Sequence, residues 1–215
     1  SVASYGLGLL LKKKFKLAIL NPLLISIIIT IAFLACTGIS YEKYDEGAKY
    51  LSYLLTPATV CLAIPLYEQL ELLKKNWHAV LIGILSGVLS SLGAILGMAV
   101  LFRFSHEEYV TFLPKSIPSA IGMGVSEKLG GEVPSSVAAF IITGVLGNIF
   151  AEIVFRLFRI HEPVAKGIAL GTASHAIGTA KAMELGEVEG AMSSLSIVVA
   201  GLITVIGATI FSHIM

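Results

Sequence analysis

The residues best suited to chemistry lie in one short polar stretch inside an apolar part of the chain. It reads Gly171-Thr172-Ala173-Ser174-His175, followed by Gly178 and Thr179. Hydroxyls, glycines and an imidazole so close together favour a locally unwound helix, whose free N–H groups and half-helix dipole attract an anion. The alternative is tight helix packing, in which small residues let two backbones approach. We predict that an anion is bound by Thr172, Ser174, His175, Gly178 and Thr179.

Two ionisable side chains in apolar surroundings each have two interpretations. His175 either binds a carboxylate or carries a proton, or it is a neutral ring satisfied by a neighbouring carbonyl. Lys115 lies between Pro114 and Pro118. It is either the counter-ion of a bound anion, with Ser116 beside it, or a snorkelling side chain that reaches the lipid head groups.

A second interrupted element is expected earlier in the chain, at Thr56-Pro57-Ala58-Thr59. Pro57 and the later Pro65 each remove a helical N–H donor, which leaves carbonyls free and kinks or breaks the helix. A kink alone is the structural alternative. We predict that Thr56, Pro57 and Thr59 face residues 171–179 and complete the binding site.

Other classes of function are not indicated. The chain has no G-x-S-x-G elbow, no H-E-x-x-H and no Walker loop, and its five histidines are dispersed without metal-ligand spacing. Fifteen basic and fourteen acidic residues leave a net charge of +1, with no basic block to follow a phosphate backbone. We therefore expect no catalytic residues, metal, cofactor or nucleic acid.

The composition is that of a membrane protein. Apolar residues make up 56% of the chain and charged residues 13%, against roughly 25% charged in a typical globular domain. Residues 17–41, 76–102 and 190–215 contain no Asp, Glu, Lys or Arg, and each stretch exceeds the roughly 20 residues that cross a bilayer. We expect residues 1–215 to form one all-α, polytopic membrane domain.

Hydropathy predicts about seven spans plus one broken segment. Ser1–Leu11 is apolar but short, and we expect it to be the second half of a first span. Residues 109–130 contain prolines and glycines, which makes this segment re-entrant or strongly broken. The remaining predicted spans are residues 17–39, 50–73, 77–102, 133–155, 167–183 and 191–215.

The positive-inside rule orients these segments. If 109–130 enters and leaves on one side, every basic cluster faces the cytoplasm, with the amino end outside. Segment 167–183 then crosses outward, so that Glu184–Glu189 lies outside and Met215 inside. The basic clusters are Lys12–Lys16, Lys74–Lys75 and the loop with Arg156, Arg159 and Lys166.

The chain also shows a weak internal repeat, 1–104 against 105–215, whose corresponding spans run in opposite directions. This predicts the inverted-repeat architecture of secondary transporters, with two interrupted helices near the midplane. Two glycine pairs, Gly83/Gly87 and Gly93/Gly97, are spaced for close helix contact, either internally or in a homodimer or higher oligomer. On 133–155, we expect Asn148 to bond a neighbouring helix and Glu152 to be solvated.

Several of these motifs are similar to those of the LrgB/CidB family, over nearly the whole chain. The most specific is Gly171–Ala180 together with Glu187-x-Glu189-Gly190-Ala191. The others that carry the resemblance are Asn21-Pro22-Leu23-Leu24, Thr56-Pro57-Ala58-Thr59-Val60, Ala63-Ile64-Pro65-Leu66-Tyr67 and Leu113-Pro114-Lys115-Ser116.

The resemblance implies a multi-pass protein of the bacterial inner membrane and two possible functions. One is an antiholin-like regulator of murein hydrolase activity and cell lysis, acting with a small holin-like membrane partner. The other is a gradient-driven carrier of a small monocarboxylate, since similar proteins of plastid envelopes move glycolate and glycerate and bacterial members are linked to pyruvate transport.

Overall fold

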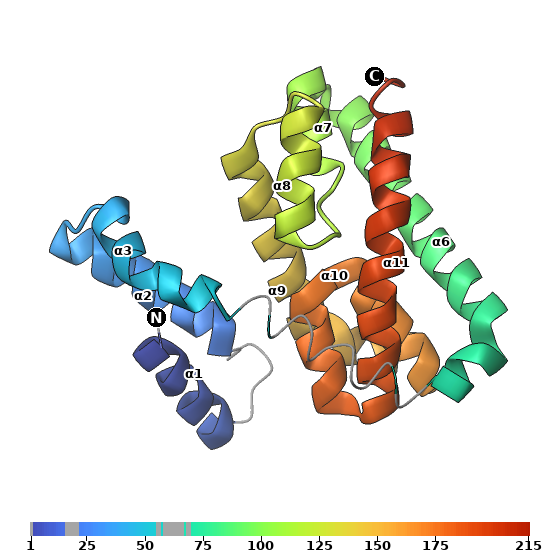
Figure 1. Cartoon of the computed structure of the whole chain (residues 1–215), viewed down its shortest axis with the longest axis horizontal. Coiled ribbons are helices and arrows are strands. Elements are labelled where there is room, and N and C mark those ends of the chain that lie inside the picture. Colours follow the sequence, from blue (N-terminus) through green and yellow to red (C-terminus); the bar gives the residue numbers. More distant parts are fainter. Residues whose placement is uncertain (1, 16–21, 55–56, 58–66, 68–69) are drawn as a thin grey trace. The chain divides into compact units, whose positions relative to one another are not determined.

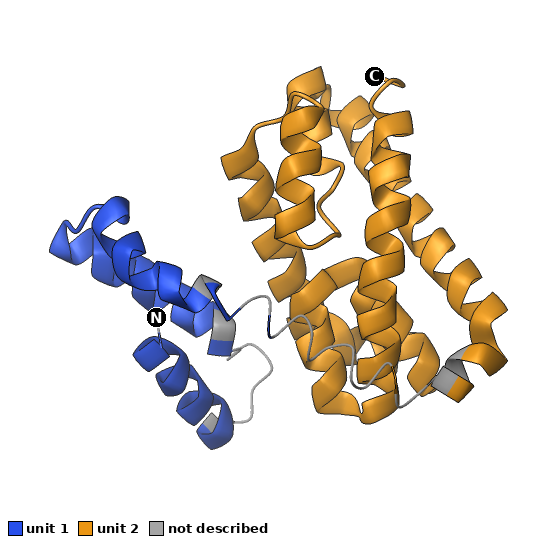
Figure 2. Ribbon diagram, in the orientation of Figure 1, with its two compact units in different colours: residues 1–61 blue, residues 62–215 orange. Residues whose placement is uncertain are grey.

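The computed structural model describes residues 2–15, 22–54, 57, 67 and 70–215 (Figure 1). The elements of this part of the chain are all helices, which confirms the all-α prediction there. The chain folds as two compact units, unit 1 with residues 1–61 and unit 2 with residues 62–215 (Figure 2).

Unit 1 contains α1 (Val2–Phe15), α2 (Pro22–Thr37) and α3 (Tyr41–Ser52). Helices α1 and α2 pack together, with the Ser4 hydroxyl 3.0 Å from that of Ser26. Proline suits the first turn of α2, where its missing N–H costs nothing, and Gly38 ends this helix at a φ of +64°. The apolar part of α2 covers residues 24–37, shorter than the predicted span 17–39. The predicted span 50–73 lies largely outside the described residues.

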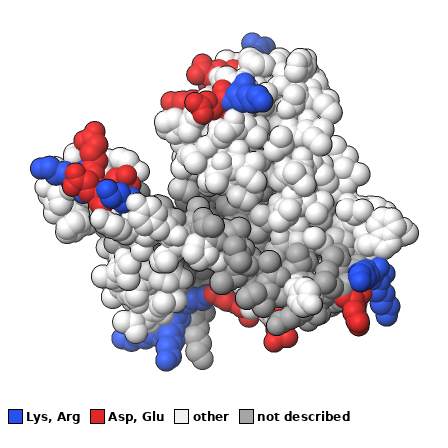
Figure 3. Space-filling view, viewed as in Figure 1, with Lys and Arg blue, Asp and Glu red and all other residues white. Residues whose placement is uncertain are grey.

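Three long helices of unit 2 are apolar enough to cross a membrane: α6 (Leu70–Phe102), α9 (Val133–Leu157) and α11 (Glu187–Phe211). They are the candidate spans of the described part of the chain, and they confirm helices at 77–102, 133–155 and 191–215. On the face of unit 2 shown in Figure 3, charged side chains gather at the two ends and leave an uncharged band between them. This distribution suits a bilayer, in which charge is costly at mid-depth.

The predicted broken segment forms a helical hairpin, hairpin A, from α7 (His106–Phe112), residues 113–118 and α8 (Ser119–Lys128). Near the end of α8, the Ser126 hydroxyl lies 2.6 Å from that of Ser136. The Ser136 hydroxyl also donates to the carbonyl of Thr111, in α7, at 2.9 Å. Residues before and after the turn therefore lie side by side, and the segment returns to the end of unit 2 at which it entered. The predicted break in this segment is thus confirmed, and the segment folds back on itself.

Helix α10 (Pro163–Leu185) is interrupted at His175, whose φ is 43° and ψ −136°. Residues on either side of the break contact the same part of α11. A Cβ atom on Gly167 would lie 2.5 Å from the carbonyl oxygen of Glu189, and one on Gly190 would lie 2.9 Å from Cγ of Met183. In a straight helix, residues 167 and 183 are about 24 Å apart. Helix α10 must therefore fold back on itself.

A second pair of contacts locates the fold. The Thr179 hydroxyl lies 2.7 Å from that of Ser193, and Gly171 also packs against Ser193. The pairs 167/183 and 171/179 are both centred on residue 175, so His175 is the tip of a second helical hairpin. We call α10 hairpin B, with a first arm (163–174) and a second arm (176–185). The predicted interruption of this segment is confirmed.

Hairpin B corrects the predicted threading, because a segment that folds back does not cross. Residues 184–189 consequently lie at the same end of unit 2 as the basic loop with Arg156 and Lys166. Met215 lies at the opposite end, where its carbonyl oxygen is 2.6 Å from Nδ1 of His106. The predictions that 167–183 is a span, that Glu184–Glu189 lies across the membrane from the basic loop and that Met215 shares the side of that loop are wrong.

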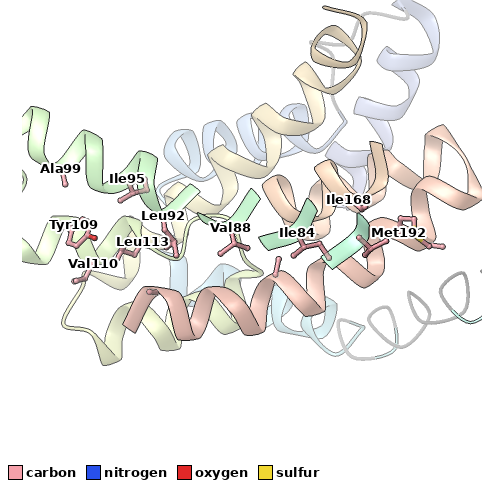
Figure 4. Close-up of a cluster of buried hydrophobic side chains, with 14 residues drawn as sticks. Ile84, Val88, Leu92, Ile95, Ala99, Tyr109, Val110, Leu113, Ile168 and Met192 are labelled. Atoms are coloured by element: carbon pink, nitrogen blue, oxygen red, sulfur yellow. The ribbon is translucent and has the colours of Figure 1, made fainter. Parts of the chain in front are cut away.

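The core of unit 2 lies between α6, α11 and hairpin A (Figure 4). Its α6 side chains are fully or almost fully buried and recur every three or four residues, the spacing of one helix face: Ile84, Val88, Leu92, Ile95 and Ala99. Tyr109 and Leu113 of hairpin A pack against this face. The core thus fixes hairpin A beside α6. The repeat of 1–104 in 105–215 includes residues that are not described and stays a prediction.

Candidate substrate-binding cavity

The tips of the two hairpins line one cavity of about 1140 Å³ in unit 2, which we call the tip cavity. Hairpin A supplies Lys115 and Ser116, and hairpin B supplies residues near the end of its first arm. Helices α6 and α9 form the remaining walls. The polar lining residues are Asn76, Ser90, Ser91, Lys115, Ser116, Thr143, Glu162, Thr172 and Ser174.

One face of α6, with Gly83, Gly87 and Ser91, contacts both hairpins. A Cβ atom on Gly83 would lie 3.3 Å from Cγ2 of Ile168, and one on Gly87 would lie 2.8 Å from Cγ2 of Thr172. One turn further, the Lys115 ammonium donates to the Ser91 hydroxyl at 3.1 Å. Residues four apart in a helix lie on one face, so Gly83, Gly87 and Ser91 place the first arm of hairpin B and the tip of hairpin A in line.

Among the described residues, Lys115 is held by hydroxyls and not by a carboxylate. Its Nζ donates to Ser91 at 3.1 Å and to Ser116 at 3.3 Å, and these two hydroxyl oxygens are 2.9 Å apart. Among the described residues, no Asp or Glu forms an ion pair with it. Glu162 also lines the cavity. Residues 168 and 172 of α10 lie beside residues 83 and 87 of α6, so Glu162 lies near residue 77. Residue 77 is roughly 20 Å from Ser91 along the helix.

The depth of Lys115 bears on its two interpretations. Its partner Ser91 is eleven residues from Phe102, the last residue of α6, and therefore about 16 Å from that end of the helix. A snorkelling ammonium would lie near the end of a span. The position in mid-helix favours the other interpretation, a cation that faces a bound anion.

Thr172 and Ser174 reach the cavity because glycines make room for them. Gly87 of α6 faces the methyl group of Thr172, and a Cβ atom on Gly147 of α9 would overlap the Ser174 hydroxyl. Thr172 is 5% exposed, and its hydroxyl oxygen has no hydrogen-bond partner among the described residues. The structure thus brings together four predicted residues: Lys115, Ser116, Thr172 and Ser174.

The other predicted residues of hairpin B do not line the cavity. The His175 ring is 3% exposed, and its Nε2 lies 3.0 Å from the carbonyl oxygen of Phe140. A carbonyl only accepts, so Nε2 carries the proton, as in the interpretation of a satisfied neutral ring. Thr179 donates to the His175 carbonyl at 3.1 Å, and Gly178 packs against the Leu170 carbonyl within the hairpin.

The first predicted element is not placed against the cavity. Thr56 and Thr59 lie outside the described residues, and Pro57 is a helical, exposed residue of unit 1. The prediction that residues 56–59 face 171–179 therefore stays a prediction.

Two predicted polar residues of α9 hold hairpin B. Asn148 Nδ2 donates to the Ile177 carbonyl at 3.2 Å, which confirms the expected bond to a neighbouring helix. Glu152 is half-exposed, but its carboxylate pairs with Lys181 at 2.5 Å, so the expectation of a merely solvated side chain was incomplete.

Sequence reasoning missed Ser90, Ser91 and Thr143. The adjacent serines in the charge-free stretch 76–102 were a usable signal, since Ser91 continues the four-residue spacing of Gly83 and Gly87. Within the part of the chain that the structure describes, no group of three His, Cys, Asp or Glu side chains is arranged to hold a metal ion. Besides Asn76 and Glu162, which lie toward the other end of the cavity, its polar groups are hydroxyls and the Lys115 ammonium, which suit an oxyanion.

No solved structure matches the chain. The sequence model of the LrgB-like family matches residues 1–214, and this includes both hairpins and all residues of the tip cavity. The resemblance seen in the motifs is thereby confirmed, and this apolar, helical membrane protein belongs to the LrgB-like family.

Proposed function

We propose that this protein is a gradient-driven carrier of a small monocarboxylate such as pyruvate, glycolate or glycerate, in the bacterial inner membrane. The observation that carries the proposal is the Lys115 ammonium, which is bound by two serine hydroxyls and meets no described carboxylate at the junction of two opposed hairpins. Secondary transporters bind their substrates near the midplane, between interrupted helices.

The electrostatics favour a monocarboxylate. An ammonium at membrane depth is costly without a counter-charge, so a carboxylate that binds there recovers part of that cost. Ser91 and Ser116 orient the ammonium; one of the two hydroxyls donates to the other, which leaves one hydroxyl hydrogen for the same anion. A second carboxylate on the substrate would meet no further cation among the lining residues, since Lys115 and Glu162 are the charged members of the lining.

The test is uptake of labelled pyruvate and glycolate into liposomes that contain the purified protein, under an imposed proton gradient. We expect saturable uptake by the natural protein and a fall of at least about tenfold in Lys115→Gln, the scale of a lost charged hydrogen bond. Lys128→Gln is the matched control, because Lys128 is an exposed lysine of the same hairpin. Absence of saturable uptake, or equal losses in both variants, would refute the proposal.

An antiholin-like regulator of cell lysis is the second candidate, and one observation favours it. Gly93 and Gly97 lie on α6, and a Cβ atom on either would meet none of the described residues within 4 Å. Such a face suits another helix, from a second copy of this chain or a small holin-like protein. If regulation is the function, Gly93→Leu and Gly97→Leu will change lysis in cells while Lys115→Gln does not. A carrier whose flux controls lysis gives the opposite result.

A further inference from the structure

The hydroxyl of Thr172 differs from those of Thr179, Ser194 and Ser196, which are also buried in hairpin B and α11. A Ser or Thr within a helix usually donates to a carbonyl of the preceding turn. Thr179, Ser194 and Ser196 do so, at 3.1, 2.9 and 2.7 Å. Thr172 makes no such bond, although its side chain is 5% exposed. Buried hydroxyls are nearly always paired, so an orphan in a cavity lining indicates a position that a ligand completes.

The position of Thr172 relative to Lys115 follows from α6. The Thr172 methyl group faces Gly87, and the Lys115 ammonium is bonded to Ser91, four residues later. Side chains four apart in a helix have Cβ atoms about 5–6 Å apart. A carboxylate that accepts a hydrogen bond from Lys115 lies only about 2.8 Å from the ammonium. The next carbon of the acid, carbon 2, is therefore close to Thr172.

We infer that Thr172 is a specificity-determining residue that binds an oxygen on carbon 2 of the acid held by Lys115. This rests on the proposed carrier function. A threonine hydroxyl donates and accepts, so it serves a 2-oxo and a 2-hydroxy acid alike. An acid that lacks the oxygen leaves the Thr172 hydroxyl unpaired, and a site built around such a group discriminates against that acid.

The experiment measures the affinity of the purified full-length protein for pyruvate, lactate and propionate, from the rise in its melting temperature with ligand concentration. These three-carbon acids differ only at carbon 2. We expect the natural protein to bind pyruvate and lactate about fivefold to tenfold more tightly than propionate, the scale of one neutral hydrogen bond.

Two variants of Thr172 separate the hydroxyl from the shape of the side chain. In Thr172→Val, which keeps the shape, the affinities for pyruvate and lactate should fall to that for propionate, while propionate binding stays unchanged and reports an intact fold. Thr172→Ser, which keeps the hydroxyl, should retain the preference. The inference is overturned if the natural protein binds propionate as tightly as lactate, or if Thr172→Val weakens all three acids equally. If the natural protein binds none of them, the proposed function itself fails.

Discussion

Gly87 of α6 faces the methyl group of Thr172 so closely that a Cβ atom at residue 87 would lie 2.8 Å from Cγ2. Carbon atoms do not approach so near, and a threonine in a helix has only two favoured χ1 rotamers, so its methyl group has few other positions. We therefore expect Gly87→Ala to push hairpin B from α6 and to destabilise the protein by about 1–3 kcal/mol, the usual range for overpacking. Thermal unfolding in detergent measures this.

The double variant Gly87→Ala/Thr172→Ser tests the cause, because serine lacks Cγ2. We expect it to recover most of the lost melting temperature. Gly93→Ala is the matched control, since nothing lies within 4 Å of a Cβ atom there. A double variant no more stable than Gly87→Ala alone would show that another contact is responsible.

Hairpin B predicts which loops share a side of the membrane. With Cys36 and Cys61 replaced by serine, single cysteines at Arg159 and Glu184 should react with an impermeant maleimide from the same side. A cysteine at Glu107 should react from the other side. The readout is labelling of sealed vesicles of known orientation. Labelling of positions 159 and 184 from opposite sides would show that residues 167–183 cross the membrane.

The pair of Glu152 on α9 and Lys181 on hairpin B should respond to reversal of its charges. Glu152→Lys and Lys181→Glu each place like charges together, and each should lower the stability by about 0.5–1 kcal/mol, because the Glu152 side chain is 53% exposed. The double reversal should recover part of the lost melting temperature, because Glu184, whose carboxylate lies 3.5 Å from the Lys181 ammonium, repels a glutamate at residue 181. If the double variant shows only the sum of the two losses, the residues do not interact.

Glu108, outside the membrane-spanning helices, predicts a dependence of stability on pH. The backbone N–H and hydroxyl of Ser105 donate to its carboxylate at 2.7 and 3.0 Å, and these bonds lower the pKa of Glu108. A lowered pKa in the folded state stabilises the fold above the unfolded pKa, and this contribution is lost as the pH falls through the folded value.

Glu108→Gln resembles the protonated side chain and tests this sign. The melting temperature of the natural protein should exceed that of the variant at neutral pH, and the gap should close in acid, below the ordinary range of a glutamate. A gap that is constant with pH would show that the charge of Glu108 does not contribute.

The positions of the chain breaks were predictable because their causes are local. Pro114 and Pro118 cannot donate within a helix, and the structure breaks between α7 and α8 at these residues. Likewise, the cluster of small and hydroxyl residues around His175 predicted the interruption of α10. Four of the predicted binding residues, among them Lys115 and Thr172, line one cavity for the same reason, since they flank these breaks.

The direction of the chain after the second break was not predictable from hydropathy. A stretch of about seventeen mostly apolar residues has the composition of a span whether it crosses or folds back. The packing of Gly167 and Gly171 against α11, a tertiary contact, determines that the chain folds back. The spacing of the contact residues on either side of residue 175 can be read from the sequence. It indicates a hairpin only when both arms are known to pack against α11.

The tip cavity begins beside Asn76 and Glu162, at one end of unit 2, and reaches Lys115 about midway along α6. If that end is wetted, the insulating layer between Lys115 and the opposite compartment is only about half the bilayer thickness. A membrane voltage would then fall mainly across hairpin A, whose buried core residues form that layer. Movement of a charged acid past Lys115 would be electrogenic unless a proton accompanies it, and the rate would depend on voltage at that single step.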